Sequence, residues 1–126
     1  MSASQVKPDP KPARRTSDPK LLRSLHLHAD RCRACGCRKQ LTLHHLVPRG
    51  QRGDDVKANL IFLCGSGTSG CHGALTAHRN ASWPSQLAGK PWQVVASRIR
   101  RTLRLSEVDY VLAKKGQAWL ERTLPL

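Results

Sequence analysis

Two kinds of metal-binding side chain alternate between residues 32 and 79 of this chain. Thiols occur on both sides of the stretch, and four of them suit a structural zinc ion, which prefers closed, tetrahedral coordination by soft ligands. Imidazole and amide side chains occur between and beyond the thiols, and they suit a second, open metal site that could do chemistry. The first set is Cys32, Cys35, Cys64 and Cys71, and the second set is His44, His45, Asn59 and His72.

The assignment of the thiols rests on their spacing. Cys32 and Cys35 form a Cys-x-x-Cys pair, which alone also serves redox chemistry, but a second pair downstream favours zinc. Residues 65–70 are only glycine, serine and threonine, so this segment could fold back and bring Cys64 and Cys71 to one ion. Cys37 is the spare cysteine and could compete with Cys35 as a ligand. The odd number of cysteines argues against a complete set of disulfides.

The adjacent histidines lie in residues 40–47, whose alternating pattern predicts a strand. Neighbouring residues of a strand point to opposite faces, so one histidine could face a metal while the other faces a substrate. Hydrolysis of a phosphodiester needs a base for the attacking water and a cation for the developing negative charge. An imidazole with a pKa of about 6.5 is a serviceable base, and the carbonyl of a neighbouring loop could hold its tautomer.

The elements around these residues follow from the same patterns. A basic loop over residues 48–55 and a returning strand over 58–63 are followed by a helix over 71–79. Upstream, Ser17 with Pro19 behind it predicts the start of a helix that runs to about residue 29.

We expect the C-terminal third of the chain to form helices that pack on the core. A helical stripe after Pro91 predicts a core-facing helix, Ser106 with Asp109 suggests a variant capping box for another, and residues 118–120 fit a short last helix. The residues of the stripe are Trp92, Val95, Ile99 and Leu103.

The charge of the chain indicates its class of partner. Lysine and arginine number 22 against 8 acidic residues, giving a net charge of +14, which favours nucleic acid as partner. The N-terminus has no apolar signal segment and no run is long enough to span a membrane, so we expect a cytoplasmic protein without a membrane partner. The candidate phosphate contacts are Arg49, Arg52, Arg79, Arg98 and Arg101.

Read in order, Cys-x-x-Cys, His-His, Asn-Leu-x-x-Leu-Cys and Cys-His resemble the HNH endonuclease family over roughly residues 25–79. The resemblance implies a ββα-metal fold with zinc knuckles, in which His44 and His72 hold a catalytic cation and His45 is the general base. It makes Asn59 the central asparagine, which ties the loop between the strands. His78 is a secondary metal candidate. Two protein ligands would leave room for water and phosphate, which favours Mg²⁺ or Mn²⁺ over a second zinc ion.

We therefore expect a small α+β protein with a ββα-metal HNH core, stapled by zinc and flanked by N- and C-terminal helices. The expected parts are a disordered basic arm (1–19), the nuclease core with its zinc knuckles (20–80) and a helical support segment packed on the core (81–126). The leading hypothesis is a metal-dependent DNA endonuclease or nickase that binds DNA mainly through phosphates. The alternative is a zinc-knuckle nucleic-acid-binding module without catalysis.

The resemblance also extends to a biological setting. The compact core with a short basic arm is similar to small HNH nucleases encoded by bacteriophages, some of which act beside the packaging terminase. It is also similar to restriction and mobile-element nucleases. On this interpretation the chain would work in a bacterial or phage-infected cytoplasm, with terminase or packaging proteins as candidate partners.

Overall fold

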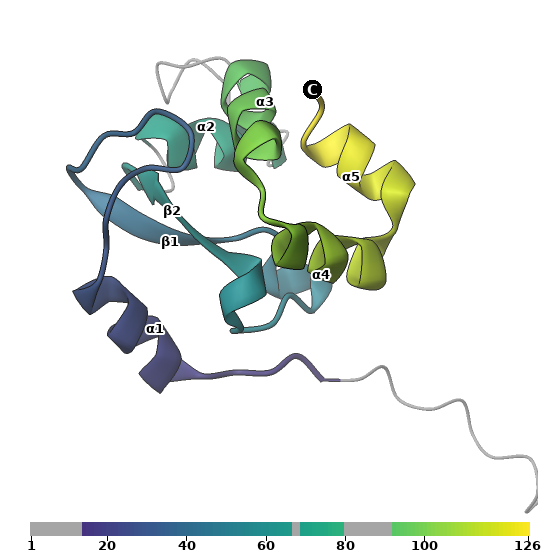
Figure 1. Cartoon of the computed structure of the whole chain (residues 1–126), viewed down its shortest axis with the longest axis horizontal. Coiled ribbons are helices and arrows are strands. Elements are labelled where there is room, and N and C mark those ends of the chain that lie inside the picture. The colour runs from purple at the N-terminus through teal and green to yellow at the C-terminus, as the bar shows by residue number, and fades with distance from the viewer. Residues whose placement is uncertain (1–13, 67–68, 80–91) are drawn as a thin grey trace, which may run out of the picture.

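A computed structural model describes residues 14–66, 69–79 and 92–126 of the chain. Within these residues two antiparallel strands form one small sheet, and helices lie on both of its sides (Figure 1). The strands are β1 (Leu41–His45) and β2 (Leu60–Cys64), and the helices are α1 (Pro19–Leu27), α2 (Gly70–Arg79), α3 (Trp92–Thr102), α4 (Leu105–Lys115) and α5 (Gln117–Thr123). The expected α+β class is confirmed.

The two faces of the sheet have different neighbours. The register pairs Leu41 with Cys64 and His45 with Leu60, so alternate residues along each strand share a face. His44 lies on the face covered by α2, where its ring is in edge contact with the ring of His72. The opposite face is covered by α1, where Phe62 meets the ring of His26. Adjacent side chains of β1 therefore lie on opposite faces of the sheet.

The turn between β2 and α2 brings the last two cysteines together, as the sequence predicted. Gly65 has a φ of +88° and Gly70 a φ of +63°, and a Cβ at Gly65 would stand 2.1 Å from the carbonyl oxygen of Ser69. Only glycine fits so close an approach with a left-handed backbone. The backbone of Ser66 and Ser69 pairs across the turn, and α2 starts directly after it.

The C-terminal helices pack onto the core. Val95 and Ile99 of α3 are buried against it, with Trp92 and Leu103 half-buried beside them, so the predicted stripe faces the core. A buried ion pair attaches α4: the Arg33 guanidinium donates to both carboxylate oxygens of Glu107 at 2.7 and 2.9 Å. Because Arg33 lies between the first two cysteines, this pair links the cysteine cluster to the C-terminal helices.

Several predicted boundaries were wrong by a few residues. The cap of α1 is Asp18 and not Ser17, because the Asp18 carboxylate accepts the backbone N–H of Leu21 at 3.1 Å. The helix ends at Leu27, before the predicted residue 29. The strands are shorter than predicted, because Lys57–Asn59 forms a 3-10 turn before β2.

The capping box of α4 was also misplaced. Glu107, and not Asp109, supplies the capping carboxylate, and it accepts the backbone N–H of Arg104 at 2.7 Å. Ser106 therefore lies inside the first turn of α4 and is not its cap.

Among the described residues, every helix is too short or too polar to cross a membrane.

Candidate functional site

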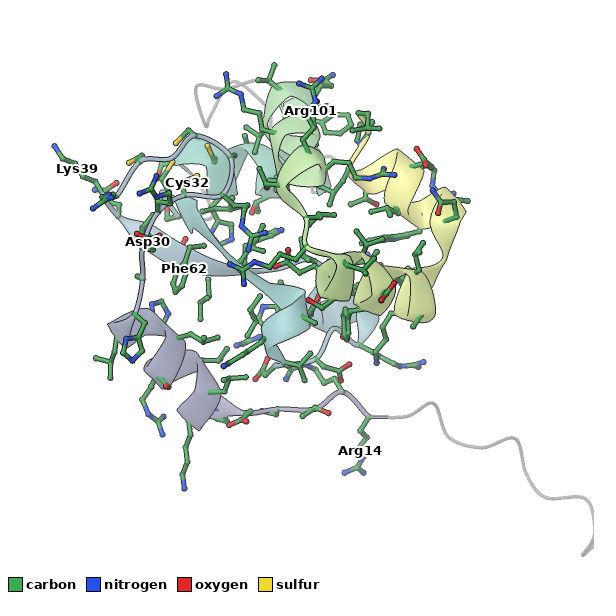
Figure 2. All side chains as sticks on the ribbon, in the orientation of Figure 1. Arg14, Asp30, Cys32, Lys39, Phe62 and Arg101 are labelled. Atoms are coloured by element: carbon green, nitrogen blue, oxygen red, sulfur yellow. The ribbon has the colours of Figure 1, made fainter. Side chains whose placement is uncertain are left out.

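The four predicted zinc ligands converge on one point near the start of α2. Their Sγ atoms all lie within 4.8 Å of one another, and those of Cys35 and Cys64 are 3.6 Å apart. Ligands at Zn–S distances of about 2.3 Å in a tetrahedron stand about 3.8 Å apart, so the cluster fits zinc. Figure 2 shows the sulfur atoms around Cys32. Cys37 is outside the cluster and its sulfur contacts the backbone of Lys39 instead.

The electrostatics of the cluster favour a bound cation. A hydrogen bond from Cys71 lowers the pKa of Cys32 to about 4, and the same bond raises the pKa of Cys71 far above that of a free thiol. Burial raises the pKa of Cys64. Several thiolates so close together repel one another, and a divalent metal removes that penalty because it binds the deprotonated form. Backbone N–H groups of Cys35 and Cys71 also point at the sulfurs of Cys32 and Cys64, at 3.5 Å each.

His44 and His72 form the core of the second predicted site. Their ring centroids are 5.1 Å apart with an interplanar angle of 80°, and His44 is only 3% exposed. The Thr42 hydroxyl lies 2.6 Å from His72 Nδ1. This hydroxyl can donate its single proton to the carbonyl of Gly65 at 2.9 Å and accept from His72 at the same time when the proton of His72 is on Nδ1. The tautomer that results has its lone pair on Nε2, the form in which imidazole binds a metal.

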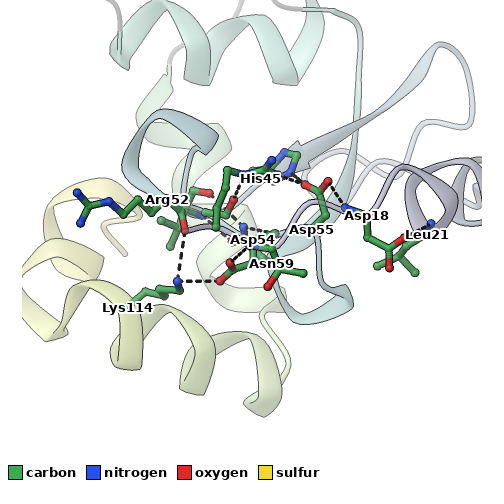
Figure 3. A network of polar contacts seen from close by, with 12 residues as sticks. Asp18, Leu21, His45, Arg52, Asp54, Asp55, Asn59 and Lys114 are labelled. Carbon is green, nitrogen blue, oxygen red and sulfur yellow. Dashed lines mark hydrogen bonds and ion pairs between the residues drawn. The ribbon is translucent and has the colours of Figure 1, made fainter. Parts of the chain in front are cut away.

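His45 points away from this pair, toward the loop between the strands. Its Nε2 is 2.8 Å from Oδ1 of Asp55 (Figure 3). Burial lowers the pKa of His45, the hydrogen bond with Asp55 opposes that effect, and the charge of Arg49 adds to it. The result is an uncharged imidazole at neutral pH, and 12% of its side chain remains exposed to solvent. The partner is a carboxylate, whereas the sequence had suggested a loop carbonyl.

Asn59 is completely buried and binds the loop between the strands to β1. Its side-chain oxygen accepts the N–H of Val47 at 2.7 Å, and its Nδ2 donates to the carbonyls of Val47 at 3.1 Å and Asp54 at 2.9 Å. These contacts place it in the tying role that the resemblance implied. Asn59 therefore holds the loop beside His45.

Replacing Asn59 with alanine should destabilise the protein strongly. Three buried hydrogen bonds would be lost, and unsatisfied buried groups cost about 1–3 kcal/mol each, so we expect a loss of about 3–5 kcal/mol in the free energy of unfolding. Urea unfolding measures it. The matched control is Gln51→Ala, an exposed residue of the same loop, which should change little. Equal unfolding midpoints for the two variants would contradict the role given to Asn59.

A second set of contacts holds the loop to α4. The Asp54 carboxylate accepts from the Tyr110 hydroxyl at 2.6 Å, from Lys114 Nζ at 2.8 Å and from the N–H of Thr16 at 2.6 Å. Burial acts to raise the pKa of Asp54, but the contacts from Lys114 and Tyr110 outweigh it and bring the pKa to about 2. Two segments outside the hairpin, residues 14–18 and α4, thus fix the loop that lies beside His45.

The ionisation of Tyr110 provides a test of this contact. Burial, together with the hydrogen bond to Asp54, raises the pKa of Tyr110 to about 12. Because the pKa of Tyr110 is higher in the folded protein, the protonated phenol stabilises the fold. This stabilisation is complete below the unfolded pKa of about 10, and it is lost as the pH rises through the folded pKa. Tyr110 is the only tyrosine, so tyrosinate ultraviolet absorbance follows it alone.

We expect the native midpoint of this titration to lie about two pH units above the midpoint in urea. Asp54→Asn should lower the native midpoint, because it removes the charge beside the hydroxyl. Coincident native and unfolded curves would contradict the contact.

The arginines predicted to contact phosphates lie on the loop between the strands, on α2 and on α3. Arg49 and Arg52 are exposed on the loop beside His45. Arg98 and Arg101 are exposed on α3, and Arg101, labelled in Figure 2, belongs to the last turn of that helix. His78 and Arg79 belong to the last turn of α2, but their side chains fall outside the described residues.

Sequence reasoning missed the residues that surround the loop. Asp54, Asp55, Tyr110 and Lys114 were not singled out, and residues 14–18 were assigned to a disordered arm although they contact the loop. One signal was available: two of only 8 acidic residues are adjacent in an otherwise basic loop.

The geometry agrees with the comparison to known protein families. Residues 32–77 match the HNH endonuclease family model, a segment that includes all four clustered cysteines, both strands and the two histidines in ring contact. Curated proteins and solved structures gave no match to the chain. Residues 32–77 of this chain are therefore similar to the HNH endonuclease family.

Proposed function

We propose that this protein is a metal-dependent endonuclease that hydrolyses phosphodiester bonds of DNA. The observation that carries the proposal is the separation of the histidines by the sheet. His44 meets His72 on one face, while His45, the next residue along β1, points to the other face and keeps part of its ring in solvent. A hydrolase of this kind needs a metal position and a base, and this arrangement supplies a candidate for each.

In this proposal His44 and His72 would hold a divalent cation. The Thr42 contact orients His72 for it, in the way that ligating histidines are commonly held through their other ring nitrogen. Two imidazoles leave most coordination positions to water and phosphate oxygens, which suits Mg²⁺ or Mn²⁺. Such an ion would supply the positive charge that stabilises the phosphorane and the leaving 3′ oxygen.

His45 would take the proton from the attacking water. Asn59 keeps the loop in place beside it through the backbone of Val47 and Asp54, so the base stays in one position when DNA binds. Arg49 and Arg52, exposed on the same loop, would contact the phosphates next to the scissile bond. The four-cysteine cluster would hold zinc as a structural ion, with no open position for substrate.

The chemistry of the products tests this mechanism. If the leaving group is the 3′ oxygen, the cut leaves 5′-phosphate and 3′-hydroxyl ends. DNA ligase should therefore reseal nicked plasmid directly after the protein is removed. Nicks that ligase closes only after end repair would contradict the mechanism. Plasmid that is bound but never nicked would instead favour the alternative, a non-catalytic zinc-knuckle module.

A further inference from the structure

The carboxylate of Asp55 lies where three segments of the chain meet. Asp55 is 2% exposed. Its Oδ1 accepts from His45 Nε2 and from the Arg15 guanidinium, and its Oδ2 accepts the backbone N–H of Asp18 at 2.8 Å (Figure 3). The backbone N–H of Asp55 donates to the carbonyl of Thr16 at 2.8 Å. Residues 15–18 therefore bind both carboxylate oxygens and the backbone N–H of Asp55, in addition to the contact with His45.

The donors around Asp55 define the proton on the shared bond. A guanidinium and a backbone N–H are donors only, and they are the partners of an ionised carboxylate. An ionised carboxylate has no proton to give, so the proton between Asp55 and His45 belongs to Nε2 of the imidazole. In the neutral ring the lone pair is then on Nδ1, at the other side of the ring.

We propose that Asp55 is a positioning residue for the reaction: it fixes His45 in the tautomer whose Nδ1 accepts the proton of the attacking water, and Arg15 holds Asp55 in place. The inference rests on the proposed function. It extends the active site to the segment that precedes α1, which lies outside the matched domain of residues 32–77. Arg15 is anchored a second time, because its Nε donates to the carbonyl of Gly53 at 2.7 Å.

Asp54 is the matched comparison for Asp55. Both carboxylates are buried, both belong to the same loop and both bind the segment of residues 14–18. Asp54 is directed toward Tyr110 and Lys114, whereas Asp55 is directed toward His45. If both carboxylates served folding alone, Asp54→Asn and Asp55→Asn should have similar effects on the cleavage rate. If Asp55 positions His45, only Asp55→Asn should lower that rate.

The first experiment compares single-turnover cleavage of plasmid by zinc-loaded wild type, Asp55→Asn and Asp54→Asn, each below its melting temperature. The asparagine amide can donate to Nε2 and favour the opposite tautomer, so we expect Asp55→Asn to lose at least about 100-fold in rate with unchanged DNA affinity. Asp54→Asn should keep the wild-type rate. Arg15→Ala should fall between them. Equal rates for folded Asp55→Asn and wild type would overturn the inference.

The second measurement reads the tautomer directly and needs no substrate. Nitrogen-15 shifts of the ring, assigned with His45→Ala, should place the proton on Nε2 in wild type and in Asp54→Asn at a pH where the ring is neutral. Asp55→Asn should move it to Nδ1. A proton on Nδ1 in wild type would overturn the inference even if the protein cleaves DNA. A wild type that never cleaves would instead refute the proposed function, while the tautomer still reports on the Asp55 contact.

Discussion

Replacing Cys71 with serine should abolish zinc binding and unfold the protein. Structural zinc contributes an apparent binding free energy of about 10–16 kcal/mol at neutral pH, whereas the net stability of a small domain is about 5–15 kcal/mol. Cys71 is buried and its sulfur lies within 4.8 Å of the other three. The loss of one of four thiolates weakens the site enough to remove most of this contribution. Zinc content and the circular dichroism melting curve measure the two effects together.

Cys37 supplies the matched control. Its sulfur forms hydrogen bonds with the backbone of Lys39, and it is not one of the four clustered thiols. Cys37→Ser should therefore keep one equivalent of zinc and the wild-type melting temperature. A Cys71→Ser variant that stays folded without zinc would refute the structural role. Loss of zinc from Cys37→Ser would move the ligand assignment from Cys35 to Cys37.

Replacing His45 with alanine should abolish cleavage and leave the fold intact. A general base contributes about 10²–10⁴-fold in rate, and among the described side chains His45 is the imidazole that contacts Asp55 of the loop. His45 belongs neither to the zinc cluster nor to the His44–His72 pair, so zinc content and DNA affinity should be unchanged. Single-turnover cleavage beside an electrophoretic mobility shift separates binding from chemistry.

His28→Ala is the control for this substitution. His28 is exposed and caps the C-terminal end of α1, whereas the contact with Asp55 is made by Asp18 at the other end of this helix. The control should cut at the wild-type rate. If His45→Ala also cuts at that rate, the base has been assigned to the wrong residue.

The sequence predicted the parts of this site that have a fixed spacing. The cysteine pairs, the alternation that separates His44 from His45, and the glycines of the turn at residues 65–70 are local patterns with local causes. The helical stripe through Val95 and Ile99 is another, because a period of 3.6 residues puts both on one face.

The contacts around the loop could not be predicted in this way. The Asp54–Tyr110 contact spans 56 positions and the Arg15–Asp55 contact spans 40, and neither pair leaves a periodic trace in the sequence. The cap of α1 shows the same limit. Ser17 and Asp18 are both suitable N-cap residues. Asp18 is the cap in the structure, and its backbone N–H also donates to Asp55, a tertiary contact that the local sequence does not reveal. A phage setting and terminase partners stay predictions, because the fold and the site have no feature specific to them.

Conversion of supercoiled plasmid by the zinc-loaded protein tests the central claim most directly. Wild type and His45→Ala, prepared identically, are incubated with plasmid with and without added Mg²⁺, and binding is followed in parallel. We predict nicked or linear DNA only for wild type and only when Mg²⁺ is added, while both proteins bind. Plasmid that both proteins bind but that stays supercoiled throughout, with Mn²⁺ as well as Mg²⁺, would contradict the account.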